Sequence, residues 1–248
     1  MTDAPEEQLT GGNMASVSRV GDTVRREAGP WTPAVHALLD AWAEAGIAES
    51  PRALGFDERG REILSFIDGD VLADAVPRIL WSARVLDQCA RLLRRLHDAS
   101  THLVGSDLVW RGPVHPPFEV ICHNDVAPYN LIERDGDVVG IIDADMASPG
   151  SRLWDLAYLV YRLAPFAEDA DGFDPSLHGT ADERMRALVA AYGGSFGDDE
   201  VRAMMVRRLE RLAEFTDARA AETGRADFLD HASMYRRDAA RLAARNAT

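Results

Sequence analysis

Apolar and polar residues alternate over short distances in the first quarter of the chain, a period typical of β-strands. We expect one strand in ASVSRVG and another in DTVRREA, joined by a tight turn at Gly21 and Asp22. A second pair lies in PRALGFDERGREILSFIDGD, with its turn at residues 57–60. The pattern therefore predicts a small antiparallel sheet at the start of the chain.

A helix is expected between the two strand pairs. Thr32 precedes Pro33, so threonine would cap the helix and proline would occupy its first position. The spacing of the apolar residues places four of them on one face, which we expect to be buried: Val35, Leu38, Leu39 and Trp42.

Helical spacing dominates after about residue 76. ARVLDQCARLLRRLHDAS predicts a strongly amphipathic helix that ends near His97. A strand, a loop and a second strand at 138–142 follow, and the remaining segments with helical spacing are 153–163, 181–192, 200–223 and 228–244. We expect an α+β fold in which a strand-rich part, residues 1–67, meets a larger helical part, residues 68–248.

The composition is that of an ordinary globular chain of 248 residues, 46% hydrophobic and 27% charged. No apolar run is long enough to span a bilayer, and the acidic N-terminus resembles neither a signal nor a transit peptide. Two cysteines, Cys89 and Cys122, cannot build a disulfide framework. We therefore expect a cytoplasmic protein without a membrane partner.

The net charge of −14 argues against a nucleic-acid partner, because phosphates require a basic face. It favours a cationic small molecule as ligand. All 27 Lys+Arg residues are arginines, so no mechanism that needs a lysine amine can operate.

The segment VICHNDVAPYNLIERDGDVVGIIDAD, residues 120–145, has polar groups between apolar strands. A solvated loop, a metal site and a phosphoryl-transfer site are all possible there. Phosphoryl transfer needs a carboxylate to accept the proton of a hydroxyl, and oxygen ligands for a metal on the phosphates. Asp125, Asn130 five residues later and Asp143 after the next strand have the kinase spacing. A hairpin would bring Asp143 back beside Asn130.

The other polar residues of the segment are interpreted more simply. His123 is expected to brace the loop. Asn124, Asp135 and Asp137 are interpreted as turn formers, and Glu133 as a solvated charge.

A non-haem iron site is a competing interpretation, because His123 and Asp125 match the start of a two-histidine, one-carboxylate motif. His178 or His231 would supply the second histidine. This reading leaves Asn130 and the second aspartate unexplained, and it expects a β-rich core where the sequence predicts helices.

HNDVAPYN followed by IIDADMASPGSRLWDLAYL resembles the aminoglycoside phosphotransferase-like (choline kinase-type) kinases. Their pattern is H-x-D-x-x-x-x-N, an apolar strand ending in Asp, then G-x-x-x-x-D-L-A. The likeness is specific over residues 123–157 and weaker from 9 to 192. GGNMASVSRVGDTVRR is similar to small phosphotransferases labelled trifolitoxin-immunity-like. The resemblance implies a protein-kinase-like two-lobe fold, with a β-rich N-lobe and a larger helical C-lobe.

The resemblance also implies roles for individual residues. Asp125 would be the catalytic base, and Asn130 and Asp143 would hold Mg²⁺ against the nucleotide. Asp155 would accept hydrogen bonds from the catalytic-loop backbone, although an acid favoured by a helix N-terminus is the alternative. Asp145 would face either the site or the solvent.

ATP or GTP would bind at the lobe junction, at residues 64–67. Backbone groups there, with Phe66 and Ile67 lining the pocket, would hold the base. The kinase lysine that binds the phosphates is missing, and the matching strand offers Arg25 and Arg26. We favour Arg26, because it follows Val24 in the V-x-basic register.

Two further departures concern the same half of the site. The helix position of the glutamate that usually pairs with the lysine falls near His36, which we interpret as a packing residue. The glycine-rich loop is incomplete, with Gly11 and Gly12 followed by NMAS.

The sequence thus predicts a Mg²⁺-dependent phosphotransferase that moves the γ-phosphoryl group of ATP or GTP to a hydroxyl of a small, cationic, aminoglycoside-like molecule. The alternative is a kinase-like binding or immunity protein that sequesters a toxin or metabolite without turnover. A protein kinase fits less well, because only a short segment separates Asp143 from Asp155. The acceptor and the oligomeric state are left open.

Overall fold

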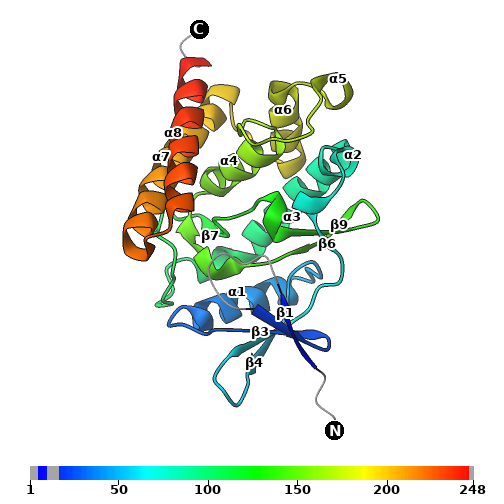
Figure 1. The fold of residues 1–248 in the computed structure, drawn as a ribbon, viewed down its shortest axis with the longest axis vertical. Helices are drawn as coiled ribbons and strands as arrows, with labels where there is room; N and C mark the ends of the chain where they lie inside the picture. Colours follow the sequence, from blue (N-terminus) through cyan, green and yellow to red (C-terminus); the bar gives the residue numbers. More distant parts are fainter. Residues whose placement is uncertain (1–4, 10–16, 246–248) are drawn as a thin grey trace.

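The computed structural model describes residues 5–9 and 17–245. Figure 1 shows a sheet of short strands at one end of the molecule and a group of helices at the other. The predicted glycine loop, with Gly11 and Gly12, lies outside the described residues.

The N-terminal sheet is antiparallel and has five strands in the order β1-β2-β3-β5-β4. Both expected hairpins form, and Gly21 at the first turn has a φ of 59°, which favours glycine. The register places Arg26 opposite Glu62, so both side chains point to one face of the sheet. The strands are β1 Glu6–Leu9, β2 Val17–Val20, β3 Thr23–Arg26, β4 Ala53–Phe56 and β5 Glu62–Ser65.

Helix α1, Thr32–Glu44, follows the first hairpin and buries the predicted apolar face. Its N-cap is Trp31, one residue before the predicted one. Thr32 instead accepts a hydrogen bond from the backbone N–H of Gly29, at 2.9 Å, through its hydroxyl. The indole N–H of Trp42 donates to the carbonyl of Leu96, at 3.1 Å, and ties α1 to the next long helix.

That helix is α3, Ala83–Ser100, which continues three residues beyond His97. The strand predicted at 138–142 is β9, one residue earlier than expected. Short strands and turns follow α3 and carry the polar segment: β7 Val120–Cys122, η3 Pro128–Asn130, β8 Leu131–Arg134, β9 Asp137–Ile141, η4 Ala144–Met146 and β10 Ser148–Gly150.

The C-terminal part is helical, and the four predicted helices form with ends that shift by two residues or fewer. Helices α7 and α8 lie side by side along one edge of the molecule (Figure 1). The helices here are α4 Arg152–Leu163, α5 Pro175–His178, α6 Ala181–Tyr192, α7 Asp198–Thr223 and α8 Ala226–Arg245. The short elements before α3 are β6 Asp70–Val71, η1 Leu72–Asp74 and α2 Pro77–Leu80.

One hydrophobic cluster joins the two parts of the chain. It runs from Val35 of α1 and Leu64 of β5 to Leu93 of α3 and Leu159 of α4. The division at residue 67 therefore stays a prediction. Among the described residues, no helix is both long enough and apolar enough to cross a bilayer.

Candidate active site

Asp125 is presented by the loop that follows β7. Its Oδ1 accepts a hydrogen bond from the Tyr129 hydroxyl at 2.5 Å, and its Oδ2 accepts one from the Asn130 amide at 2.9 Å. Burial raises the pKa of Asp125 above its ordinary value, against the hydrogen bond from Tyr129, which lowers it. Both oxygens of this carboxylate are therefore held in place by neighbouring side chains.

Asn130 and Asp143 are brought together by the β8–β9 hairpin. The backbone N–H of Ile142 donates to the carbonyl of Asn130 at 2.9 Å, which places the next residue, Asp143, beside it. The Asn130 Nδ2 also donates to the backbone carbonyl of Asp125, at 2.9 Å, so its amide oxygen is left for another partner. Asp143 has a φ of 62°, and its side chain is 51% exposed. The amide oxygen of Asn130 and the carboxylate of Asp143, both suitable as metal ligands, thus lie next to Asp125.

Asp155 lies in the first turn of α4 and is fully buried. Its Oδ1 accepts the backbone N–H of Asn124, at 2.9 Å. Its Oδ2 accepts the backbone N–H of His123, at 2.8 Å, and lies 3.1 Å from His97 Nε2. Burial alone would raise the pKa of Asp155, but the hydrogen bonds and charge of His97 and the contacts of His123 outweigh it and lower that pKa. Its contacts are those expected of an acid that holds the loop backbone.

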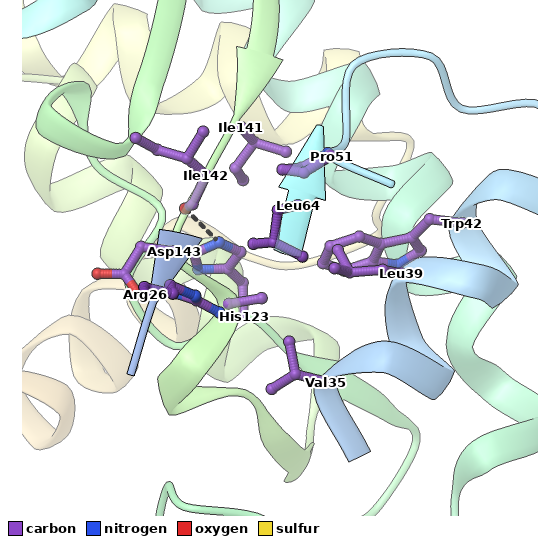
Figure 2. Close-up of a pocket in the computed structure, with 11 residues that line it drawn as sticks. Arg26, Val35, Leu39, Trp42, Pro51, Leu64, His123, Ile141, Ile142 and Asp143 are labelled. Atoms are coloured by element: carbon purple, nitrogen blue, oxygen red, sulfur yellow. Dashed lines mark hydrogen bonds and ion pairs between the residues drawn. The ribbon is translucent and has the colours of Figure 1, made fainter. Parts of the chain in front are cut away.

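His123 connects the loop to the end of β9. Its Nδ1 accepts the backbone N–H of Asp125 at 3.3 Å, and its Nε2 lies 3.1 Å from the carbonyl of Ile142. Figure 2 shows its ring between Asp143 and Trp42, with the contact to Ile142 dashed. The contacts are those of the bracing residue that the sequence predicts.

Asn124 does more than form a turn. Its φ of 67° fits the predicted turn. Its buried amide also donates to the carbonyl of Met146 and the hydroxyl of Ser148, both at 2.8 Å, and accepts the indole N–H of Trp154 at 3.0 Å. It therefore fastens the loop of Asp125 to the segment that follows Asp143.

Arg208 of α7 is a buried cation beneath the loop, which the sequence analysis missed. Its guanidinium donates to the carbonyl of Asn124 and lies over the rings of Trp154, at 4.7 Å, and Tyr158, at 5.0 Å. Its positive charge is one of the effects that lower the pKa of Asp125. Nothing distinguishes it in sequence from the other arginines of this helix.

Arg26 of β3 faces the acids that follow β9. Its Nη1 lies 3.4 Å from Asp143 and its Nη2 lies 2.7 Å from Asp145. Asp145 thus turns toward Arg26 and not toward solvent, and its side chain is 15% exposed. Arg25 points to the other face of the sheet, where it contacts Thr23 at 2.6 Å.

Glu62 is a second residue that the sequence analysis did not single out. Its side chain is 1% exposed, and its carboxylate accepts hydrogen bonds from Arg26 Nε and, at 2.8 Å, from His36 Nε2. Burial would lower the pKa of Arg26, but the charges of Asp145 and Glu62 raise it above its ordinary value. His36 therefore makes a polar contact, which differs from the packing role we inferred for it.

The junction of the two lobes follows β5. The backbone N–H of Phe66 donates to the carbonyl of Asp22 at 2.9 Å, and the guanidinium of Arg19 lies 3.7 Å above its ring. The side chain of Ile67 packs closely on Gly140. A β-carbon added to Gly140 would lie 2.7 Å from the side chain of Ile67.

A cavity of about 10 Å³, the room of one water molecule, lies behind Arg26. Figure 2 shows its walls, which are apolar except at the end formed by Arg26, His123 and Asp143.

Comparisons with known proteins agree with the predicted resemblance. Residues 106–204 match the model of a family described as the phosphotransferase enzyme family, and they include Asp125, Asn130, Asp143 and Asp155. The chain is 38% identical over 168 residues to the trifolitoxin immunity protein of Rhizobium leguminosarum bv. trifolii, over 65% of this chain and 63% of that protein. The aligned region thus spans less than two thirds of this relative. The two resemblances that the sequence suggested, to the phosphotransferase family and to a trifolitoxin immunity protein, are therefore confirmed.

Solved structures show the same fold. The ethanolamine kinase of Plasmodium vivax aligns with a TM-score of 0.69 at 14% identity, over 95% of this chain and 82% of that one. The GDP complex of aminoglycoside 2'-phosphotransferase-IIIa aligns with a TM-score of 0.65 at 14% identity, over 97% of this chain and 94% of that one. These likenesses confirm the predicted fold, a β-rich N-lobe and a larger helical C-lobe arranged as in kinases.

Proposed function

We propose, from the matched phosphotransferase segment and the geometry around Asp125, that the protein transfers the γ-phosphoryl group of ATP or GTP to a hydroxyl of a small molecule. The observation that carries the proposal is the meeting of Asp125, Asn130 and Asp143 at the end of the β8–β9 hairpin. A binding protein without turnover has no need of a half-buried carboxylate beside two oxygen ligands.

Asp125 would act as the base. An acceptor hydroxyl that replaces the Tyr129 hydroxyl at Oδ1 would be held within hydrogen-bond distance, ready to give its proton to the carboxylate. The raised pKa of Asp125 makes this carboxylate a stronger base than an exposed aspartate. The Asn130 amide, which donates to Oδ2 of Asp125, and the bracing residue His123 keep the carboxylate oriented.

The donors around Asp143 fit Mg²⁺, which prefers carboxylate and amide oxygens. Asn130 offers an amide oxygen, and Asp143 and Asp145 offer carboxylates. When bound, the ion would neutralise charge on the transferred phosphoryl group. The chain's own contribution is to hold these oxygens on one side of Asp125.

Arg26 would bind the nucleotide phosphates, because its guanidinium forms an ion pair with Asp143. The guanidinium has two terminal nitrogens, so it can bind phosphate with a fork of hydrogen bonds where a lysine would make a single contact. The base would lie at the lobe junction, beside Phe66 and Ile67.

A small cationic acceptor is supported by two features. The net charge of −14 attracts cations. Tyrosine side chains also lie next to the catalytic carboxylate of Asp125. The hydroxyl of Tyr129 lies 2.8 Å from that of Tyr158, which is hydrogen-bonded to Tyr235. Aromatic faces attract ammonium groups.

A non-catalytic immunity protein is the second candidate. It is favoured by the name of the curated relative and by Tyr129 and Asn130, which occupy both oxygens of Asp125. In this case the surface around Asp125 would bind a toxin or a metabolite without turnover.

The two candidates differ in a transfer assay. We would incubate the purified protein with Mg²⁺, γ-labelled ATP or GTP, and a panel of amino sugars, nucleosides and peptides. We expect labelled product with the wild type and at least about a thousandfold less with Asp125→Asn.

Asp135→Asn is the matched control, since Asp135 is an exposed turn residue with a φ of 55°, which asparagine tolerates. Nucleotide binding without any transfer or hydrolysis, with biological protection intact in Asp125→Asn, would establish the binding protein instead.

A further inference from the structure

Three side chains from three different elements are in contact next to Asp143 and Asp145. Arg26 of β3 and Glu62 of β5 are directly opposite each other in the sheet, and His36 comes from α1. Glu62 is in contact with both of the others and is almost completely buried. A buried carboxylate is costly unless it is paired, so the contacts with Arg26 and His36 hold Glu62 in place and fix the positions of both partners.

The contact with Glu62 sets the direction of the guanidinium. Glu62 takes the Nε edge of Arg26, and the terminal nitrogens are left to point at Asp143, 3.4 Å away, and Asp145, 2.7 Å away. Because the guanidinium is planar and rigid, holding one edge orients the whole fork. The end that carries the two terminal nitrogens is thus aimed at the place where the proposed metal and phosphates would lie.

We propose that Glu62 is a positioning residue for Arg26, so that the anchor of the phosphate-binding cation belongs to strand β5, and α1 contributes only through His36. The inference rests on the proposed function, in which Arg26 binds nucleotide phosphates. The sequence analysis expected the partner of this cation on helix α1, near His36, because kinases have the corresponding glutamate on a helix.

The location of the carboxylate has a consequence. A carboxylate on a helix can leave its cation when the helix moves, which is how kinases switch the pair on and off. Arg26 and Glu62 are neighbours in a hydrogen-bonded ladder, at the paired positions of β3 and β5. The sheet keeps them together, and the cation stays oriented wherever α1 lies.

A double-mutant cycle tests the inference. The dissociation constants of ATP and GTP with Mg²⁺ would be measured by calorimetry for the wild type, Arg26→Ala, Glu62→Gln and the double variant. We expect each single variant to bind about tenfold more weakly, because each loses an oriented charge-assisted contact. The double variant should be no weaker than Arg26→Ala, because Glu62 acts through Arg26.

A kinetic measurement separates positioning from folding. With the hydrolysis or transfer assay, Glu62→Gln should raise the KM for nucleotide about tenfold and change kcat much less, because the lost contact is to the phosphates and not to the base. Glu62→Asp keeps the charge but shortens the reach, and we expect an intermediate affinity. This variant keeps the test informative if Glu62→Gln does not fold.

Matched controls come from the same sheet. Glu6→Gln makes the same change on the opposite face, where Glu6 pairs with Arg61, and Arg25→Ala removes an arginine from that face. Both should bind nucleotide as the wild type does. His36→Phe should weaken binding by no more than about threefold, since the Arg26–Glu62 contact survives it.

The outcomes distinguish this inference from the proposed function. A wild type that binds neither nucleotide overturns both. Weak binding by Arg26→Ala together with wild-type binding by Glu62→Gln overturns the inference alone. So does a double variant about a hundredfold weaker than the wild type, because the two effects would then be independent.

Discussion

The backbone N–H of His123 donates to Asp155 Oδ2 at 2.8 Å, across 32 residues of sequence. Asn124, the next residue, donates to the other oxygen of the same carboxylate. One buried side chain at the start of α4 therefore holds the two residues that lead to Asp125. The geometry of Asp125 thus depends on a side chain of helix α4.

Asp155→Asn should weaken both the fold and the site. The amide cannot accept all three hydrogen bonds, and buried donors would be left unpaired, so we expect the free energy of unfolding to fall by about 3 kcal/mol. Transfer should fall as well, because Asp125 loses its support. Urea unfolding at neutral pH measures the first effect.

The effect of Asp155→Asn should also depend on pH. The pKa of Asp155 is lowered in the folded protein from its ordinary value of 3.8, so its contribution is complete above that value and is lost as the pH falls through the lower folded pKa. The difference in stability between wild type and variant should therefore shrink below about pH 4.

Asp199→Asn, at the exposed start of α7, is the control for Asp155→Asn. It should cost less than about 1 kcal/mol. If Asp155→Asn lowered the free energy of unfolding by an equally small amount, the only role of Asp155 would be that of an acid favoured by the helix dipole.

The pattern of apolar residues predicted the two N-terminal hairpins and the long helices, and motif spacing singled out Asp125, Asn130 and Asp143 as candidate site residues. The β2–β3 hairpin follows from Gly21 and Asp22, and helix α6 begins and ends where its spacing predicts. Asp125 and Asn130 could be recognised because local spacing and strand context agree. These features depend on neighbours in sequence.

The other half of the site depends on neighbours in space. Glu62 is important because the sheet register pairs it with Arg26, and that register is set by hydrogen bonds between strands far apart in the chain. Arg208 is one of several arginines on α7, and only the packing of α7 against α4 buries it. Periodicity cannot supply either fact.

Asp143→Asn should make the proposed transfer need more Mg²⁺. The variant loses one negative ligand but keeps the shape of the side chain, so we expect the Mg²⁺ concentration for half-maximal activity to rise at least about tenfold. Removing divalent cations with a chelator should abolish transfer in the wild type. Asp68→Asn, an exposed acid 77% accessible beside Arg134, should leave the Mg²⁺ dependence unchanged. An identical titration for Asp143→Asn would contradict the metal assignment.

Arg208→Met should lower kcat about tenfold, since the carbonyl of Asn124 loses its donor and the loop that carries Asp125 loses a support. The stacked methionine chain retains part of the packing on Trp154 and Tyr158, so the protein should remain folded. Arg207→Met makes the same change at the exposed neighbouring position and should leave kcat near the wild-type value. Steady-state kinetics with circular dichroism on both variants distinguishes a loosened site from a lost fold.

His115 should make the wild type lose stability in mild acid, above the range in which Asp155 titrates. Its ring stacks on Trp154 at a centroid distance of 3.7 Å. Burial first, and then the charges of Arg208 and Arg207, lower the pKa of His115 from 6.5 to about 4.

The unfolded chain therefore binds a proton at this histidine at a higher pH than the folded protein does. The stability contributed by neutral His115 is complete above pH 6.5 and is lost as the pH falls from 6.5 to about 4. His115→Phe keeps the stacking and cannot be protonated, so its stability should fall less than that of the wild type over this interval. His102→Phe, at an exposed position, should follow the wild type.

An NMR titration gives the pKa of His115 directly. That pKa should rise in Arg208→Met and rise less in Arg207→Met, because Arg208 has the larger effect. A His115 that titrates near 6.5 in the wild type would contradict this account.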